Sequence, residues 1–303
     1  MKRNALFVGM VTLDLVYLAT KLPGSNEKVA ASDYTVAAGG PATNAAVTFS
    51  YLGDRATILG VVGTHPITQL IRGDLENQGV IIADLDSTTT QPPPISSIIV
   101  TQQTGDRSVI SLNATKIEIS SDQIFKKFNS TGDLVLIDGH QMSAGYAIAK
   151  LAKNNNIPVV IDGGSWKPGF EKILPFVDYA ICSANFYPPG CSNSEEVIAY
   201  LTAAGIPNIA ITQGEKPIQC ISRGVAGEIP VPQINAVDTM GAGDIFHGAF
   251  CHYILRVNFT KALAAATKIA AYSCQFFGTR QWMQSDSIEV RAGFVNPPLP
   301  TEK

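Results

Sequence analysis

The stretch AVDTMGAGDIFHGAF, residues 236–250, carries two carboxylates, Asp238 and Asp244, on either side of Gly241-Ala242-Gly243. Apolar side chains recur at helical spacing over residues 242–255, so the glycines lie at the entry to a predicted helix. Glycine at this point lets the backbone turn tightly and lets a ligand approach the amides. The first amides of a helix lack internal partners and lie at the positive end of its dipole, so the stretch predicts a site for phosphate or another anion.

Asp244 lies in the first turn of this predicted helix. A carboxylate beside a bound phosphate can accept the proton of a hydroxyl that attacks the phosphorus, while amides carry the developing charge. Asp238 lies on the approach side, where it can position a cation or hold the turn. The spacing alone also fits a helix-start acid after an ordinary glycine turn, so both interpretations stay open. Because no Gly-Lys-Ser/Thr follows the glycines, the stretch is not a Walker loop.

Short apolar runs alternate with helical patterns along the rest of the chain. Strands are predicted at 5–10, 56–62, 134–137, 157–161, 179–182 and 209–212, and helices at 42–52, 67–78, 142–153 and 194–204. Repeated strand–helix alternation predicts an α/β, Rossmann-like fold with a mostly parallel central sheet. The strand runs are apolar throughout, so helices are expected on both faces of the sheet. We expect residues 1–303 to form one such domain.

Two segments in the N-terminal half interrupt this alternation. Residues 28–37 have no helical period and are rich in Val, Thr and Tyr, and residues 96–112 contain two β-prone runs around Thr104-Gly105-Asp106, a good hairpin turn. We expect them to form a small antiparallel β lid, with an ordinary edge extension of the main sheet as the alternative. Exposed strand edges invite pairing, so a homodimer through the lid is expected.

Composition excludes several classes of protein. The 303 residues have a net charge of −3, which is unlike the basic footprint of nucleic-acid binders. No stretch reaches 18 apolar residues, so no membrane span is expected. The five cysteines lack CxxC spacing and are typical of reduced thiols in a cytoplasmic protein. The four histidines form no i, i+4 pair, which argues against a dedicated zinc site.

Four motifs carry a resemblance to a known family. Asp238–Asp244, DTMGAGD, resembles the DTxGAGD signature of the PfkB, or ribokinase-like, sugar kinases. Gly39–Asn44, GGPATN, resembles the family's N-terminal GG…N signature, and Gly9–Asp14, GMVTLD, resembles its first-strand motif. Ile211–Lys216, ITQGEK, resembles its nucleotide-site TxGxxG region. The resemblance covers almost the whole chain and is closest to the ketohexokinase and sulfofructose kinase branches.

This resemblance implies an ATP-dependent kinase that transfers the γ-phosphate of ATP to a primary hydroxyl of a small sugar or sugar derivative. It implies that Asp244 is the catalytic base. The residues that it assigns to the anion hole are Gly241, Ala242 and Gly243. Its sugar contacts are Asp14, Gly40 and Asn44, and its nucleotide contacts are Thr212, Gly214 and Gly278. A strand-end acid, a helix-start turn and a strand-end turn are the plainer interpretations of Asp14, Asn44 and Thr212.

The same resemblance assigns cofactors. Asn185 matches the family's N-x-x-E element, which holds Mg²⁺ through water, but Pro188 stands where the acid belongs. Either Glu195 or Glu196 replaces that acid, or ATP itself holds most of the metal. A monovalent cation, K⁺, is implied near Asp238.

Substrate identity is the least specified part. Lys28, Asn113 and His140 are expected to face the lid and the sugar pocket, where Lys28 would meet an anionic substituent. The alternatives are a solvated lysine and a turn histidine. A second departure, Pro217 in place of the last glycine of TxGxxG, keeps a catalytically silent sugar or nucleotide sensor open. A nucleoside kinase of the same family is the other alternative.

Overall fold

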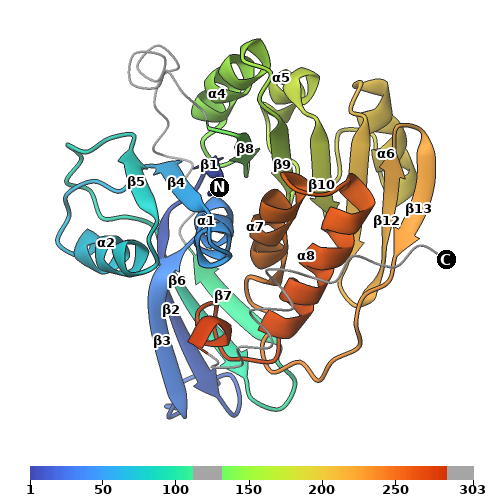
Figure 1. Ribbon diagram of the computed structural model, residues 1–303. Coiled ribbons are helices and arrows are strands. Elements are labelled where there is room, and N and C mark those ends of the chain that lie inside the picture. The colour runs from blue at the N-terminus through green and yellow to red at the C-terminus, as the bar shows by residue number, and fades with distance from the viewer. Residues whose placement is uncertain (112–131, 285–303) are drawn as a thin grey trace.

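The computed structural model describes residues 1–111 and 132–284, which form a nine-stranded main sheet, a four-stranded small sheet and flanking helices (Figure 1). The main sheet has the order β13-β12-β11-β10-β9-β8-β1-β4-β5. Its parallel strands are β1 (Asn4–Val8), β4 (Arg55–Gly60), β5 (Ile81–Asp84), β8 (Leu134–Ile137), β9 (Val159–Gly163), β10 (Tyr179–Ser183) and β11 (Asn208–Gln213). An antiparallel hairpin of β12 (Lys216–Ser222) and β13 (Val225–Ile229) completes one edge.

Helices cover both faces of the main sheet. Those on one face are α1 (Pro41–Tyr51), α2 (Thr68–Asn77), α7 (Ala242–Ile254) and α8 (Phe259–Ser273), and those on the other are α4 (Met142–Asn154), α5 (Phe170–Ile173) and α6 (Ser194–Ala203) (Figure 1). Short 3₁₀ turns lie at Leu174–Phe176 and Gln281–Gln284. Successive strand residues point to opposite faces. Phe7 therefore packs with the first group of helices, and Val8 packs with the second.

The predicted α/β fold is confirmed, with strands and helices within a few residues of their predicted bounds. The β12–β13 hairpin, β5, α5 and α8 were missing from the sequence prediction. The six predicted parallel strands are recognisable because most of their residues are apolar. The hairpin strands are not: they include Lys216, Pro217 and Glu228, which are exposed to solvent.

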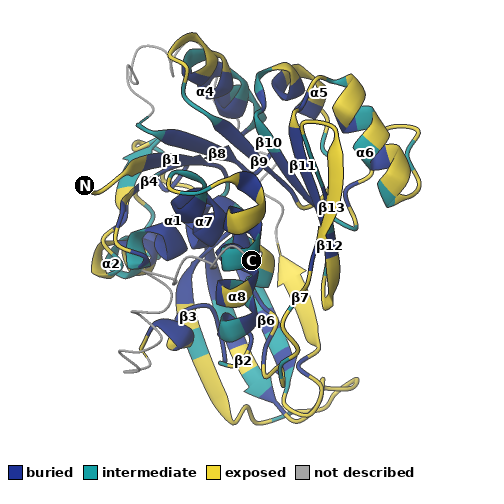
Figure 2. Cartoon of the chain, turned by 45° about the vertical axis from the view of Figure 1, so that its right-hand side comes forward, coloured by how far each residue is buried: buried dark blue, intermediate teal, exposed yellow. Residues whose placement is uncertain are grey.

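The small sheet has the order β3-β2-β6-β7 and is separate from the main sheet. Its strands are β2 (Thr12–Ala19), β3 (Asp33–Gly39), β6 (Ile95–Thr101) and β7 (Arg107–Ser111). The pairs β2–β3 and β6–β7 are antiparallel, whereas β2 and β6 are parallel. Figure 2 shows β7 exposed at one edge of this sheet.

The sequence prediction for this sheet was wrong in two details. It omitted β2, which is a central strand, and it included residues 28–32, which form no strand. The motif Gly9–Asp14 therefore does not belong to one strand: β1 ends at Val8, and Asp14 lies on β2. The apolar character of β1 and β2 is nearly continuous, so no composition change marks the boundary between them. Leu112, the predicted end of the second segment, lies outside the described residues.

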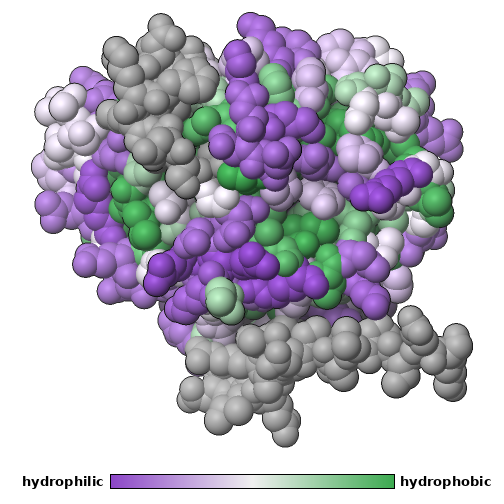
Figure 3. Space-filling model, turned by 45° about the horizontal axis from the view of Figure 1, so that its top comes forward, coloured by the Kyte–Doolittle hydropathy of each residue, from purple (hydrophilic) through white to green (hydrophobic). Residues whose placement is uncertain are grey.

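Hydrophilic side chains cover most of the face shown in Figure 3, with smaller hydrophobic areas between them. Within the described residues, none of the helices has the length and apolar character needed to cross a membrane.

Candidate active site

The start of α7 is shaped by Gly241. Its φ of 70° lies in the left-handed region, which glycine adopts without strain. A Cβ at this position would lie 2.7 Å from Cγ2 of Thr279, so a larger residue meets a steric conflict as well. The helix begins at Ala242, whose N–H donates to the carbonyl of Thr239 over 3.3 Å. The first-turn amides and the acid Asp244 therefore lie directly after a tight glycine turn, as an anion site requires.

Asp238 holds this turn in place. Its Oδ1 accepts the N–H of Met240 over 2.8 Å, and its Oδ2 accepts the N–H of Gly278 over 2.9 Å. The side chain is almost fully buried, at 2% exposure. Of the two roles considered for Asp238, the one visible in these contacts is that of tying the turn to the segment after α8. Gly278 contributes its amide to this tie and lines neither of the two large cavities described below.

Asp244 is half-buried, and Nδ2 of Asn44 donates to its Oδ2 over 2.8 Å. Burial, together with the nearby Asp162 carboxylate, raises the pKa of Asp244 to about 7, although the Asn44 hydrogen bond and His247 oppose the shift. A general base works best when its pKa lies near the operating pH. Helices α1 and α7, which carry Asn44 and Asp244, pack closely at Gly248 of α7. A Cβ at Gly248 would lie only 2.3 Å from the carbonyl oxygen of Ala45 on α1.

A polar cavity of about 350 Å³ lies between the start of α7 and the small sheet. Cross-strand register places Asp14, Ser96 and Ser111 in one row on its wall. Thr12 donates to Asp14 over 2.8 Å. Burial raises the pKa of Asp14, opposed by hydrogen bonds from Thr12 and Ser96 and by the charge of Arg280. This wall offers hydroxyls and a carboxylate, which suit the vicinal hydroxyls of a sugar.

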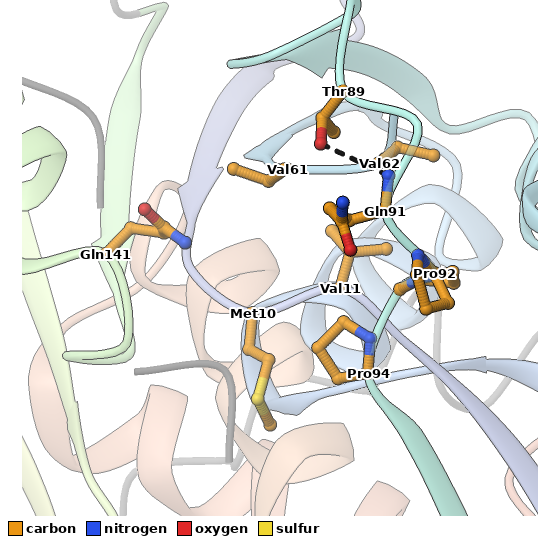
Figure 4. Close-up of a pocket in the computed structure, with 10 residues that line it drawn as sticks. Met10, Val11, Val61, Val62, Thr89, Gln91, Pro92, Pro94 and Gln141 are labelled. Carbon is orange, nitrogen blue, oxygen red and sulfur yellow. Dashed lines mark hydrogen bonds between the residues drawn. The ribbon is translucent and has the colours of Figure 1, made fainter. Parts of the chain in front are cut away.

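Three of the six predicted sugar-site residues, Asp14, Gly40 and Asn44, line the cavity. Its lining residues are Met10, Thr12, Asp14, Gly40, Asn44, Ser96, Ile98, Arg107, Val109, Ser111 and residues 239–244. Met10 also borders a crevice of about 10 Å³ against Val11, Pro92 and Pro94 (Figure 4). Such a crevice holds at most about one water molecule, so it is no candidate for a sugar.

A second cavity, of about 410 Å³, lies on the other side of the glycine turn. Thr212 and Gly214, the predicted nucleotide contacts, line it, and its remaining wall is largely aliphatic, with Ile218 and Val231 among the lining side chains. Thr239, Ala242 and Gly243 line both cavities. The two cavities therefore meet at the anion-binding turn.

Other predicted residues lie away from both cavities. Lys28 is exposed in the loop between β2 and β3, and Asn185 is exposed after β10, where its N–H donates to Oγ of Ser183. His140 lies beside Asp138, with Nδ1 3.3 Å from Oδ1 of that carboxylate. Asn113 lies outside the described residues.

Neither of the two acids considered for the magnesium site lines the two cavities. Glu196, one of the two acids considered as replacements, accepts hydrogen bonds from the N–H and hydroxyl of Ser192 at the start of α6, and Glu195 lies beside it on that helix. Within residues 1–111 and 132–284, no group of three His, Cys, Asp or Glu side chains is placed to hold a metal.

Sequence reasoning missed two arginines at this site. Arg107 of β7 lines the polar cavity, and its Nη1 donates to the carbonyl of Thr239 over 3.0 Å. Arg280 is buried and donates to Oδ1 of Asn44 over 3.0 Å. The hairpin turn before Arg107 predicted its strand, but not which side chains of that strand would face the cavity. The position of Arg280, two residues after Gly278, carried no such signal.

Comparisons with known proteins find relatives along nearly the whole chain. The chain is 24% identical to the deoxyribokinase of Salmonella typhi, covering 90% of this chain and 93% of that protein. It is 24% identical to the ribokinase of Lactococcus lactis, covering 94% and 95%. The ribokinase structure from Thermotoga maritima, 22% identical, covers 97% of this chain and 99% of its own with a TM-score of 0.76. A microbiome-derived acarbose kinase, 19% identical, covers the same shares with a TM-score of 0.79.

These structural likenesses show a shared fold. The family follows from the sequence itself, since the pfkB family carbohydrate kinase model matches residues 2–286. With that match over nearly the whole chain, the protein belongs to the pfkB family and is an ATP-dependent carbohydrate kinase.

Proposed function

We propose that this kinase transfers the γ-phosphate of ATP to a primary hydroxyl of a small sugar, with Asp244 as the general base. The observation that carries the proposal is the meeting of two cavities at one helix start. The polar cavity contains Asp14 and Asp244, the aliphatic cavity contains Thr212 and Gly214, and Ala242 and Gly243 line both. A sugar and a nucleotide bound in them would face each other across these amides.

The chemistry follows from this arrangement. The sugar hydroxyl gives its proton to the Asp244 carboxylate as its oxygen forms a bond to the γ-phosphorus. The bond from that phosphorus to the β,γ-bridging oxygen breaks, and ADP leaves. The negative charge on the phosphoryl oxygens is met by the N–H groups of residues 241–243, which act as an oxyanion-hole-type site once the Ala242 N–H exchanges its 3.3 Å bond to the Thr239 carbonyl for the phosphate.

A small free sugar fits the polar cavity better than a nucleoside does. Asp14, Ser96 and Ser111 can hydrogen-bond to hydroxyls, while Ile98 and Val109 offer apolar surface to a ring. No aromatic side chain of the described residues lines this cavity, so nothing there would stack on a base. The relatives named ribokinase and deoxyribokinase make pentoses the first sugars to test.

The nucleotide would occupy the aliphatic cavity, bringing Mg²⁺ with its phosphates. A monovalent cation near the glycine turn is part of the proposal and is tested by comparing turnover in K⁺ and in a large organic cation. The chain is proposed to work in the cytoplasm, which fits its five free cysteines.

We also propose that the small sheet acts as a lid within a homodimer. Its outer face exposes Tyr17, Tyr34, Val36 and Ile110, of which Tyr34 is 69% and Ile110 79% exposed. Cross-strand pairing puts Tyr17 beside Tyr34 in one row of this face. A second copy would bury this apolar surface. Sedimentation of the wild type and of Tyr34→Glu tests it: a wild type that is monomeric at micromolar concentration refutes the dimer.

The kinase proposal is tested by measuring ADP release over a panel of pentoses, hexoses and nucleosides, with Asp244→Asn as the control. Turnover on a sugar that drops about 10²–10⁴-fold in the variant supports it. Turnover on nucleosides alone would identify a nucleoside kinase instead. Ligand binding without any turnover would identify a sensor.

A further inference from the structure

Arg280 is a buried cation that connects four parts of the fold. Its side chain is 10% exposed. Its Nη2 donates to the carbonyl of Ala38 on β3 over 2.6 Å and lies 3.1 Å from Oδ2 of Asp74 on α2. Its Nη1 donates to Oδ1 of Asn44 on α1 and to Oγ1 of Thr279, over 3.0 and 2.9 Å. The planar guanidinium therefore binds two regions at once: Nη2 contacts β3 of the small sheet and α2, and Nη1 contacts α1.

The Asn44 contact determines which way that amide points. A guanidinium has donors only, so it must face the amide oxygen. The amide nitrogen is then directed at Oδ2 of Asp244, to which it donates over 2.8 Å. If the amide were reversed, its NH₂ group would face Arg280, and its oxygen would face the carboxylate of Asp244. Both contacts would be repulsive, so the cation selects one of the two amide orientations.

We infer that Arg280 is a positioning residue for the reaction: by orienting the Asn44 amide, it holds the Asp244 carboxylate in its ionised form and in its place beside the sugar cavity. This inference rests on the proposed role of Asp244 as general base. Arg280 itself lines neither cavity, so it acts through Asn44 and touches no substrate.

The pKa of Asp244 depends on the neighbouring charged groups as well as on its hydrogen bond from Asn44. Asp162 at the end of β9 and Asp14 on β2 both raise the pKa of Asp244, whereas His247, one turn along α7, lowers it. The Asn44 hydrogen bond also lowers the pKa of Asp244. Loss of the arginine would therefore favour the protonated, inactive form of the base.

The test compares the wild type with Arg280→Lys and Arg280→Gln, each alone and with Asn44→Ala. Lysine keeps the charge but has a single ammonium group in place of the planar guanidinium. It therefore cannot donate hydrogen bonds to Asn44, Ala38 and Asp74 at the same time. We expect kcat to fall about 10–100-fold. We also expect the acid limb of the kcat/KM profile to move to higher pH by about one pH unit. In the Asn44→Ala background the arginine change should move the limb no further, because the residue through which it acts is gone.

A matched control separates positioning from stability. Arg72 is also paired with a buried carboxylate, Asp84, at 2.7 Å, and lies on α2 near Asp74. Arg72→Met should lower the melting temperature and leave the acid limb where it is. Arg280→Gln serves as the second variant where Arg280→Lys gives no folded protein.

An unmoved acid limb in a folded Arg280 variant overturns the inference, as does an equal limb shift with and without Asn44. Asp244→Asn is measured beside these variants. If it turns over like the wild type, the base assignment itself fails. If it is inactive while the Arg280 variants keep the wild-type profile, only the positioning role fails.

Discussion

Asp162→Asn tests the electrostatics of the proposed base. Burial is the largest cause of the raised pKa of Asp244, and the Asp162 carboxylate is the second. Asp162 is itself buried and lies 3.6 Å from Nδ1 of His247, measured from Oδ2. Asparagine has almost the same shape but no charge. The substitution removes a repulsion and leaves His247 in place, so the pKa of Asp244 should fall.

The size of the effect follows from the titration. With a pKa of about 7, about one Asp244 side chain in ten is ionised at pH 6. A decrease of about one unit would raise this fraction to about a half, which gives about a fivefold gain in kcat/KM at pH 6 and almost none at pH 8. The active form of a base is the ionised one, so the acid limb must move toward lower pH.

The assay is ADP release at low sugar concentration and constant ionic strength, between about pH 5.5 and pH 9, because kcat/KM reports the pKa of the free enzyme. Asp133→Asn is the matched control. It removes the same charge from a carboxylate that pairs with Arg3. Asp133 precedes the start of β8, whereas Asp162 lies near the end of the neighbouring parallel strand β9, so the two carboxylates lie at opposite ends of these strands. An acid limb that stays in place, or that moves to higher pH in Asp162→Asn, would refute the assignment of Asp244 as the base.

Three further outcomes are expected. Asp244→Asn should have a higher melting temperature than the wild type at pH 8 and a similar one near pH 4. The pKa of Asp244 is raised from 3.8 to about 7 in the folded state, so ionisation of this side chain lowers the free energy of unfolding as pH rises through that range, by up to about 4 kcal/mol. Gly241→Ala should lower both melting temperature and turnover, since its Cβ meets Thr279, whereas Gly243→Ala, with nothing within 4 Å, should lower turnover alone; equal melting losses would contradict this. Asp14→Asn should raise KM for the sugar about tenfold or more and leave KM for ATP nearly unchanged.

Local patterns were sufficient for most of the main sheet. The strand predicted at residues 134–137 is β8 as observed, and the helix predicted at 142–153 ends one residue later. Buried parallel strands are apolar on both faces, so their ends coincide with the first polar residues. The same rule fails between β1 and β2, where apolar residues continue through a change of sheet.

Cross-strand register is the information that the sequence lacked for the sugar cavity. Asp14 was found from a motif, but Ser96 and Ser111 were not, because nothing local says which serine of a β-prone run will face the ligand. Their place follows from pairing: Asp14 lies opposite Ser96, which lies opposite Ser111. A slip of one residue in either pair would turn these hydroxyls to the other face of the small sheet.

Arg280 shows the same limit for long-range polar contacts. Arginine is usually a surface residue, so the residue type alone predicts that Arg280 is exposed. It is buried here because Asp74 and the Ala38 carbonyl replace its water, and those partners lie more than two hundred residues earlier in the chain. The sequence motifs identified candidate residues that contact the reactants, but not the residues that position them. The groups that set the orientation and charge of those residues become visible only when the fold brings the ends of the chain together.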